Sequence, residues 1–231
     1  MTLILRDITQ AYPQSRTMLN REIYVYLPTE LKEKYPEGTI LRVMKPLYGI
    51  AEAGAHWFQI YQKYYLEQLN MATSSFDACL LIRQDNADCF GIAGVQTDDT
   101  LVIGTSKFID KEEIEMKKAK FLTKPRQIFN DGDTGDFNGC RILVKDAGIT
   151  ICQKKQTEKL SLVKYSKNIS PVKQGEDKVR NCMPRQYIEQ RARGAYIASI
   201  CQPEAAFDYS VAAQVQKHEA DDVKKLNLRI N

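Results

Sequence analysis

The sequence has 231 residues, of which 43% are hydrophobic and 27% are charged, and its formal net charge is +4. This length is enough for one large domain or two small ones, and the composition is ordinary for a globular protein with a packed core. No apolar run reaches the roughly 18 to 20 residues that a membrane span needs, and the start of the chain lacks the pattern of a signal peptide. We therefore expect an intracellular protein with no membrane segment.

The cysteines exclude one kind of site, and the charges suggest another. None of the six cysteines forms a CxxC pair, and the two histidines lie far from any pair of cysteines, so the spacing of a zinc site is absent. Residues 1–100 hold 9 Lys and Arg against 12 Asp and Glu, a balance of −3, whereas residues 145–193 hold 12 against 5, a balance of +7. This asymmetry would suit a metal site followed by a polyanion-binding surface, but lysines that only keep a protein in solution give the same pattern.

The first half of the chain reads as short strands around one clear helix. The predicted strands cover residues 1–9, 23–27, 40–44, 79–83, 89–95 and 100–103. Residues 51–70 predict a helix, because apolar side chains recur at steps of three to five. The last two strands are separated only by Gln96-Thr97-Asp98-Asp99, which predicts a tight hairpin with two acidic residues at its tip.

The second half is mostly helical. A hairpin is predicted from strands at 139–144 and 149–153, and the polar segment 166–181 is the best candidate for a linker. The predicted helices cover residues 111–122, 156–165, 186–201, 208–216 and 219–230. The acidic segment 131–136 fails the calcium-loop pattern, because Gly135 stands where a ligand is required. Strands mixed with helices first, and mostly helices later, predict an α+β fold.

Three aspartates form the strongest candidate site: Asp7 at the end of a strand, and Asp98 and Asp99 at the hairpin tip. In a compact sheet these positions can converge on one edge, where three carboxylates repel one another unless cations neutralise them. Oxygen ligands without histidine or thiolate suit Mg²⁺ or Mn²⁺. Two such ions, about 3.5 to 4 Å apart, clamp an in-line phosphoryl transfer. An Asp-Asp pair at a turn is also common for conformational reasons alone, so the surrounding sequence has to decide.

A series of short motifs surrounds these aspartates. They are Arg6-Asp-Ile-Thr-Gln-Ala-Tyr12, Asn20-Arg-Glu-Ile-Tyr24 with Leu27-Pro28, Lys45-Pro-Leu-Tyr-Gly-Ile50 with Trp57, Phe76-Asp77 with Cys79-Leu-Leu81, Gln96-Thr-Asp-Asp99, Phe137-Asn-Gly139, Gly148-Ile-Thr-Ile-Cys-Gln153, and Arg193-Gly-Ala-Tyr196 with Pro203. In this order they resemble the reverse transcriptase domain of copia-type retrotransposons, especially the fungal branch. The resemblance covers nearly the whole chain.

The resemblance implies both a fold and a reaction. Residues 1–153 would form a polymerase palm, a ferredoxin-like βαββαβ unit with incomplete fingers, and residues 154–231 a mostly helical region like a thumb or connection. The chain would be part of an RNA-directed DNA polymerase. Asp7, Asp98 and Asp99 would hold two Mg²⁺ or Mn²⁺ ions while the primer 3′-hydroxyl attacks the α-phosphate of a deoxynucleotide.

By the same resemblance, further residues would contact the substrates. Tyr12 would be an aromatic gate that crowds a ribose 2′-hydroxyl, although core packing is an equally good reading of this residue. Gly49 and Glu52 would lie at the nucleotide, where the start of a helix offers unpaired amides to phosphates. The residues expected at the primer and template are Phe137, Gly139, Lys154 and Lys155.

The chain also departs from the family pattern. Glu52-Ala-Gly-Ala55 stands where the family usually has Gln-Ala-Pro-Arg, and the glutamate adds negative charge beside a triphosphate. Because Asp7 lies so close to the start, we expect the fingers to be missing and the isolated chain to be weak or inactive. The expected partners are template–primer, deoxynucleotides, and the integrase and ribonuclease H segments of a parent polyprotein, in a cytoplasmic particle or the nucleus.

Three alternatives to the polymerase remain at this stage, the last of which is a structural or interaction-only protein unrelated to polymerases. The first is a catalytically dead or domesticated fragment that only binds nucleic acid or a protein partner. The second is another palm-like two-metal enzyme, such as a nucleotide cyclase, for which the sequence offers no purine-selecting motif.

Overall fold

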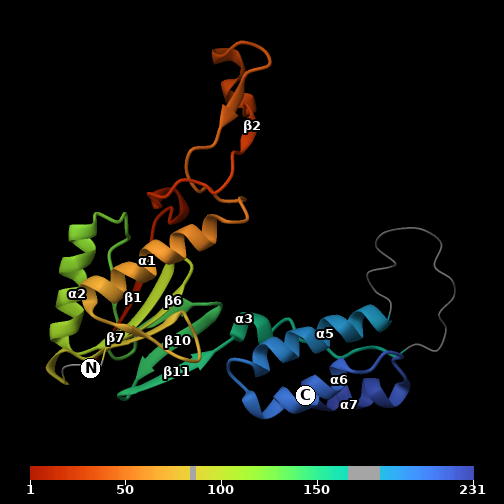
Figure 1. The fold of residues 1–231 in the computed structure, drawn as a ribbon. Helices are drawn as coiled ribbons and strands as arrows, with labels where there is room; N and C mark the ends of the chain where they lie inside the picture. The colour runs from red at the N-terminus through yellow and green to blue at the C-terminus, as the bar shows by residue number, and fades with distance from the viewer. Residues whose placement is uncertain (84–86, 166–182) are drawn as a thin grey trace. The chain divides into compact units, whose positions relative to one another are not determined.

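The structure is a computed structural model that describes residues 1–83, 87–165 and 183–231. These residues form two compact units, Met1–Asn138 and Gly139–Asn231, each of which is described by itself (Figure 1). The linker predicted at 166–181 lies outside the described residues. None of the described helices has the length and apolar character needed to cross a membrane.

A six-stranded sheet forms the centre of the first unit. Its strands are β1 (Thr2–Asp7), β4 (Ala72–Thr73), β5 (Leu80–Arg83), β6 (Gly91–Gln96), β7 (Asp99–Gly104) and β8 (Gln127–Ile128). They lie in the order β4-β5-β6-β7-β1-β8, and each neighbouring pair is antiparallel. The mixed α and β composition predicted from the sequence is confirmed, with antiparallel sheets.

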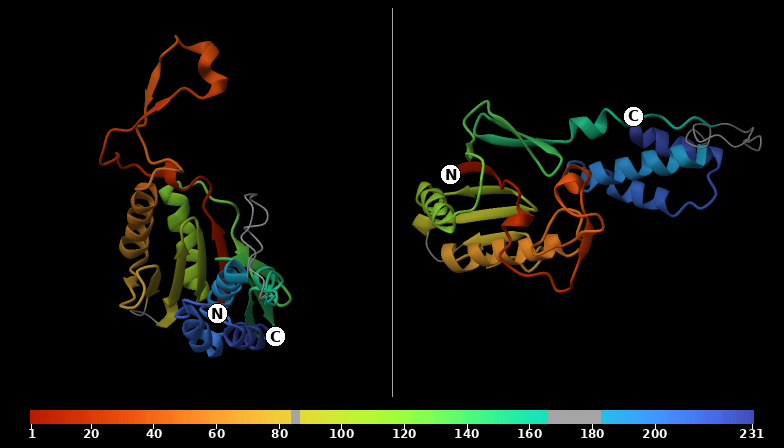
Figure 2. Two further views of the ribbon diagram at one scale, coloured as in Figure 1. Left: turned by 90° about the vertical axis from the view of Figure 1, so that its right-hand side faces the viewer. Right: turned by 90° about the horizontal axis from the view of Figure 1, so that it is seen from above.

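Two helices, α1 (Ala53–Leu69) and α2 (Ser106–Ala119), cover one face of this sheet (Figures 1 and 2). Ile4 and Ile8 alternate along the N-terminal strand and pack with Trp57, Tyr61 and Tyr65 of α1 in the main core. All five side chains are at most 1% exposed. These three aromatic residues of α1 are therefore part of the core, and the apolar stripe predicted over residues 51–70 faces the sheet.

The smaller elements of the first unit lie outside this sheet. Strands β2 (Tyr24–Tyr26) and β3 (Ile40–Arg42) pair as a hairpin that projects away from the sheet (Figure 1). Strand β9 covers Thr134–Phe137. The 3₁₀ helices are η1 (Tyr12–Gln14), η2 (Thr29–Lys34) and η3 (Ala87–Cys89).

The second unit combines a hairpin with helices. Strand β10 (Cys140–Lys145) pairs with β11 (Gly148–Cys152) across Asp146 and Ala147, which both have positive φ as in a type I′ turn. The helices are α3 (Lys154–Thr157), α5 (Met183–Ala198), α6 (Ala206–Ala213), α7 (Ala220–Ile230) and the 3₁₀ helix η4 (Pro203–Ala205). We expected the β10–β11 hairpin to belong to the first domain, but its contacts group it with the second unit.

The helix predicted over 156–165 is wrong beyond its first residues, because helix α3 ends at Thr157. Side-chain amides from other helices take up the backbone groups that a longer helix would pair. Asn227 accepts the N–H of Val163 at 2.8 Å and donates to its carbonyl at 3.0 Å. Gln190 accepts the N–H of Ser161 at 3.0 Å. Since Val163 is only 3% exposed, its burial stabilises this non-helical path.

Candidate active site

The end of β1 brings Asp7 beside the acidic hairpin. Strands β1 and β7 pair antiparallel with Asp7 directly opposite Asp99. Side chains opposite one another on antiparallel strands lie on the same face, with Cβ atoms roughly 4.5 to 5.5 Å apart. This face is the one away from α1 and α2, because the preceding pair, Arg6 and Thr100, is buried on the helix side. The predicted convergence of a strand end and a hairpin tip is present in the structure.

The hairpin tip that carries Asp98 is held from several sides. Thr97 and Asp98 form a two-residue connection between β6 and β7, and Thr97 has a φ of 55°, which is rare for a β-branched residue. The indole of Trp57 donates to the Thr97 carbonyl at 2.7 Å, and the N–H of Ile8 donates to the Asp98 carbonyl at 2.8 Å. Backbone strain of this kind persists only where the surroundings impose it, and it clusters at functional sites.

Lys124, which the sequence analysis did not single out, completes the site. Its Nζ donates to Asp7 Oδ2 at 2.6 Å, and its backbone N–H donates to the Asp7 carbonyl at 3.0 Å. The hydrogen bond to Asp7 raises the pKa of Lys124, and the charges of Asp7, Asp99 and Asp98 raise it further. The ammonium group is therefore a cation bound at the position where the sequence predicted a metal ion.

The pKa of Asp99 reflects the repulsion between neighbouring carboxylates. Burial raises the pKa of Asp99 above its usual value, and the negative charges of Asp98 and Asp7 raise it further, whereas Lys124 lowers it. Such a carboxylate gains from a nearby cation, because the cation favours its ionised form.

The donors at this edge fit a hard divalent cation, since they are all carboxylate oxygens. Across residues 1–83, 87–165 and 183–231, however, no three His, Cys, Asp or Glu side chains gather closely enough to hold a metal ion. Asp7 and Asp99 provide the opposed pair, and Lys124 holds one oxygen of Asp7. A metal ion would have to displace this lysine and draw Asp98 toward the pair.

The predicted gate residue, Tyr12, is partly buried and stacks on a second tyrosine. The rings of Tyr12 and Tyr48 lie 4.5 Å apart between centroids. The Tyr12 hydroxyl would lie 3.4 Å from a Cβ at Gly54, so the glycine lets it approach α1 closely. Burial raises the pKa of Tyr48, and the charge of Asp98 raises it further. Tyr48 is a candidate that sequence reasoning missed, although it belongs to the Leu-Tyr-Gly motif.

The two residues predicted at the nucleotide lie just before α1. Gly49 has a φ of 91° and open space around its Cα, as a turn glycine requires. Glu52 is the N-cap residue of α1, and its carboxylate accepts the Asn20 N–H at 3.2 Å and pairs with Arg21 at 3.2 Å. The negative charge that distinguishes Glu52 from the family pattern is thus partly neutralised within the chain.

The residues predicted at the primer and template are divided between the two units. Phe137 lies in the first unit, with its ring 3.9 Å from a Cβ built at Gly94 of β6. Gly94 lies on the same face of the sheet as Asp99, because its register partner on β7 is Leu101, two residues after Asp99. Gly139 (φ 75°), Lys154 and Lys155 belong to the second unit, and Lys154 lies 4.0 Å from Glu158.

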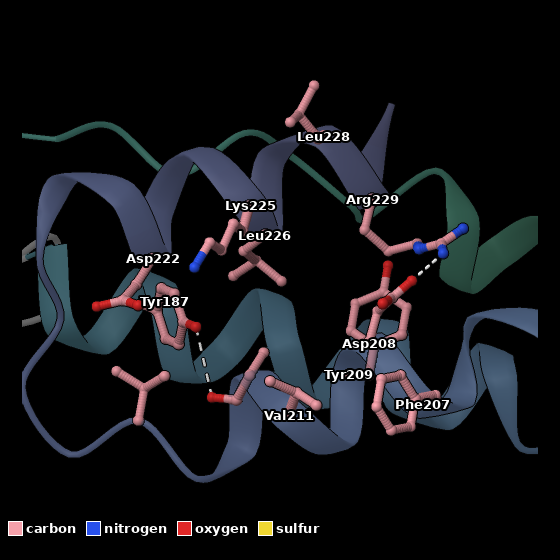
Figure 3. Close-up of a pocket in the computed structure, with 12 residues that line it drawn as sticks. Tyr187, Phe207, Asp208, Tyr209, Val211, Asp222, Lys225, Leu226, Leu228 and Arg229 are labelled. Carbon is pink, nitrogen blue, oxygen red and sulfur yellow. Dashed lines mark hydrogen bonds and ion pairs between the residues drawn. The ribbon is translucent and has the colours of Figure 1, made fainter.

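A cavity of about 440 Å³ lies in the second unit and is lined by residues of α5, α6 and α7 (Figure 3). Its walls are mainly apolar, with an ion pair between Arg229 and Asp208 at one side. None of the residues predicted to contact substrate lines it.

Comparison with known proteins identifies the family of the chain. The sequence profile of the family described as "Reverse transcriptase (RNA-dependent DNA polymerase)" matches residues 3–171, and the chain belongs to this family. Similar curated proteins are the Gag-Pol polyproteins of the transposons Ty1-DR4, Ty1-DR6 and TyH3 of Saccharomyces cerevisiae. Each is 25% identical over 130 residues, which are 56% of this chain and 7% of the relative. The resemblance to a copia-type retrotransposon is thereby confirmed.

Proposed function

We propose that the first unit is the palm of an RNA-directed DNA polymerase, and that Asp7, Asp98 and Asp99 bind the divalent ions needed for nucleotidyl transfer. The helical second unit would be the thumb- or connection-like region. The observation that carries the proposal is the register of Asp7 opposite Asp99, one residue from Asp98. The connectivity supports it, because β1-α1-β6-β7-α2-β8 with the order β6-β7-β1-β8 is the βαββαβ arrangement predicted for a palm.

In such a site the divalent ions supply an activated oxygen nucleophile and neutralise the charge that develops on the leaving pyrophosphate. The residues of the chain would hold these ions and orient the substrates. Tyr12, supported by Tyr48, would face the sugar of the incoming deoxynucleotide, with Gly49 and Glu52 at the start of α1 nearby. Phe137 would contact the primer.

The basic second unit would contribute to binding of template and primer. Gly139, Lys154 and Lys155 would contact the phosphate backbone, which requires positive charge and little reading of sequence. Because the relatives are Gag-Pol polyproteins, we also propose that the chain works beside the other segments of such a polyprotein.

One observation favours a second candidate, a module that binds nucleic acid without catalysis. Lys124 already neutralises Asp7, so the carboxylates have a cation within the chain itself. A module of this kind would bind RNA or DNA in a salt-sensitive manner, and Asp98→Asn would leave that binding unchanged.

Titration of the whole chain with Mn²⁺, followed through the electron paramagnetic resonance signal of the free ion, tests the polymerase proposal. We expect saturable binding that Mg²⁺ displaces, and weak extension of a DNA primer on an RNA template that requires the ion. Absence of saturable Mn²⁺ binding would overturn the proposal. Nucleic-acid binding without Mn²⁺ binding would support the second candidate instead.

The Lys124→Met variant tests whether the lysine competes with the metal. We expect its affinity for Mn²⁺ to rise roughly two- to fivefold, the size expected for an exposed ion pair. The matched control is Lys118→Met on α2. The Nζ of Lys118 lies 2.7 Å from Glu115, and this ion pair does not include the aspartates. An unchanged affinity in Lys124→Met would show that the ion pair and the metal do not share Asp7.

A further inference from the structure

Buried polar side chains lie on the face of the sheet opposite to Asp7 and Asp99. Arg6 donates to Glu112 of α2 twice, from Nε to Oε1 at 2.8 Å and from Nη2 to Oε2 at 2.6 Å. The two side chains are 2% and 0% exposed. A charged pair this deep in the core is uncommon, because its desolvation is costly unless the geometry is nearly ideal.

Three hydroxyl groups continue from this ion pair to strand β7. Tyr65 donates to Glu112 Oε1 at 3.3 Å, and its oxygen lies 3.4 Å from the hydroxyl of Tyr61. The Tyr61 hydroxyl lies 2.9 Å from Thr100 Oγ1. We call this set the buried polar chain: Arg6, Glu112, Tyr65, Tyr61 and Thr100.

The hydrogen bonds of the buried polar chain run in one direction. Each hydroxyl has a single proton, and Tyr65 gives its proton to the carboxylate. Tyr61 must therefore donate to Tyr65, and Thr100 to Tyr61. Burial raises the pKa of Tyr61 to about 12 and that of Tyr65 well above its usual value, so both hydroxyls keep their protons.

The two ends of the buried polar chain meet again in the sheet. Arg6 and Thr100 are register partners, and the next pair along the same strands is Asp7 opposite Asp99. Each of these aspartates is therefore joined by one peptide bond to a residue whose side chain is fixed to a helix. The resulting path from β1 through α2 and α1 to β7 is closed, so neither strand can slide or rotate at this point without breaking a buried hydrogen bond.

We propose that the buried polar chain positions Asp7 and Asp99 at the separation that metal binding requires, an inference that rests on the function proposed above. A packed apolar core would stabilise the unit equally well. Directional hydrogen bonds in a low-dielectric interior add a fixed geometry, which apolar contacts do not supply. In other metal sites, residues outside the ligand set likewise fix the orientation of the ligands.

Variants that lack single hydroxyl groups test the proposal without creating a large cavity in the core. We expect Tyr65→Phe and Thr100→Val to weaken Mn²⁺ binding about tenfold, while Thr100→Ser, which keeps the hydroxyl, restores it. The matched control is Tyr64→Phe on the same helix, because the Tyr64 hydroxyl donates to the Glu115 carbonyl outside the buried polar chain. Thermal melting of each variant shows whether the fold is retained.

A second measurement is independent of the metal. The Ile8 N–H donates to the Asp98 carbonyl, so its hydrogen exchange reports whether β1 and the hairpin tip stay together. We expect this amide to lose protection in Tyr65→Phe and Thr100→Val but not in Tyr64→Phe. Unchanged protection and unchanged Mn²⁺ affinity in folded variants would overturn the positioning role. If the unmodified chain binds no Mn²⁺ at all, the proposed function fails, and the exchange of Ile8 then shows separately whether the buried polar chain holds β1 against the hairpin tip.

Discussion

Replacing Asp99 by asparagine is expected to weaken Mn²⁺ binding by at least 10- to 100-fold and to abolish metal-dependent primer extension. Mutation of a residue that only hydrogen-bonds to a metal ligand typically lowers the metal affinity by about that factor. Loss of the ligand itself should cost no less. Binding is measured by the same Mn²⁺ titration, with circular dichroism as the check on the fold.

The same variant is expected to be at least as stable as the unmodified chain at neutral pH. A carboxyl whose pKa is raised on folding binds its proton more tightly in the native state, so its contribution to stability falls as pH rises above its unfolded pKa. The neutral amide of Asn removes this penalty. We therefore expect the difference in melting temperature to favour Asp99→Asn at pH 7 and to shrink toward pH 4.

The control for this experiment is Asp110→Asn. Asp110 lies on α2 with a side chain that is 72% exposed and a distant pairing with Arg126 at 3.8 Å. This variant should keep both Mn²⁺ binding and stability. If Asp99→Asn binds Mn²⁺ as tightly as the control does, the carboxylate edge is not the metal site.

The Arg6→Met variant is expected to lose about 3 to 5 kcal/mol of unfolding free energy, the usual cost of removing one partner of a buried ion pair. Glu112 would remain fully buried and would keep only the weaker hydrogen bond from Tyr65. Urea denaturation followed by tryptophan fluorescence measures this loss, because Trp57 is the single tryptophan of the sequence and lies in the same core.

A double variant separates the charge from the packing. Arg6→Met combined with Glu112→Met leaves no buried unpaired charge, because Glu113, which also pairs with Arg6, is 23% exposed and keeps its pairing with Lys117 at 3.0 Å. Most of the lost stability should therefore return. The double variant would still lack the buried polar chain and should bind Mn²⁺ weakly. A loss below about 1 kcal/mol in Arg6→Met alone, the range of an exposed ion pair, would mean that Glu112 finds water or another partner.

The candidate site was largely predictable because its parts are local. The strand that ends at Asp7 shows in its apolar pattern, and only a tight turn fits between the strands on either side of Thr97 and Asp98. The register that sets Asp7 opposite Asp99 follows once β1 pairs with β7. The family motifs then supplied the chemistry that an Asp-Asp turn alone does not define.

The buried ion pair between Arg6 and Glu112 was harder to predict from the sequence. Arg6 lies between Ile4 and Ile8 at the inward positions of the N-terminal strand, and Glu112 lies on the buried stripe of α2 with Ile109 and Met116. Opposite charges at two inward positions would have indicated a buried pair. Which two charges meet could not be read from the sequence, because the partners are 106 residues apart.

The sequence by itself determined the longer strands, most of the helices and the acidic hairpin, because periodicity and turn chemistry act over a few neighbouring residues. It did not indicate the short strands β4, β8 and β9. The tertiary structure alone decided that Lys124 neutralises Asp7, that Glu52 pairs with Arg21, and that residues after Thr157 leave the helical path. Each of these depends on a hydrogen bond or ion pair between segments far apart in the chain. Such contacts form only when the packed core brings the segments together, so no local pattern encodes them.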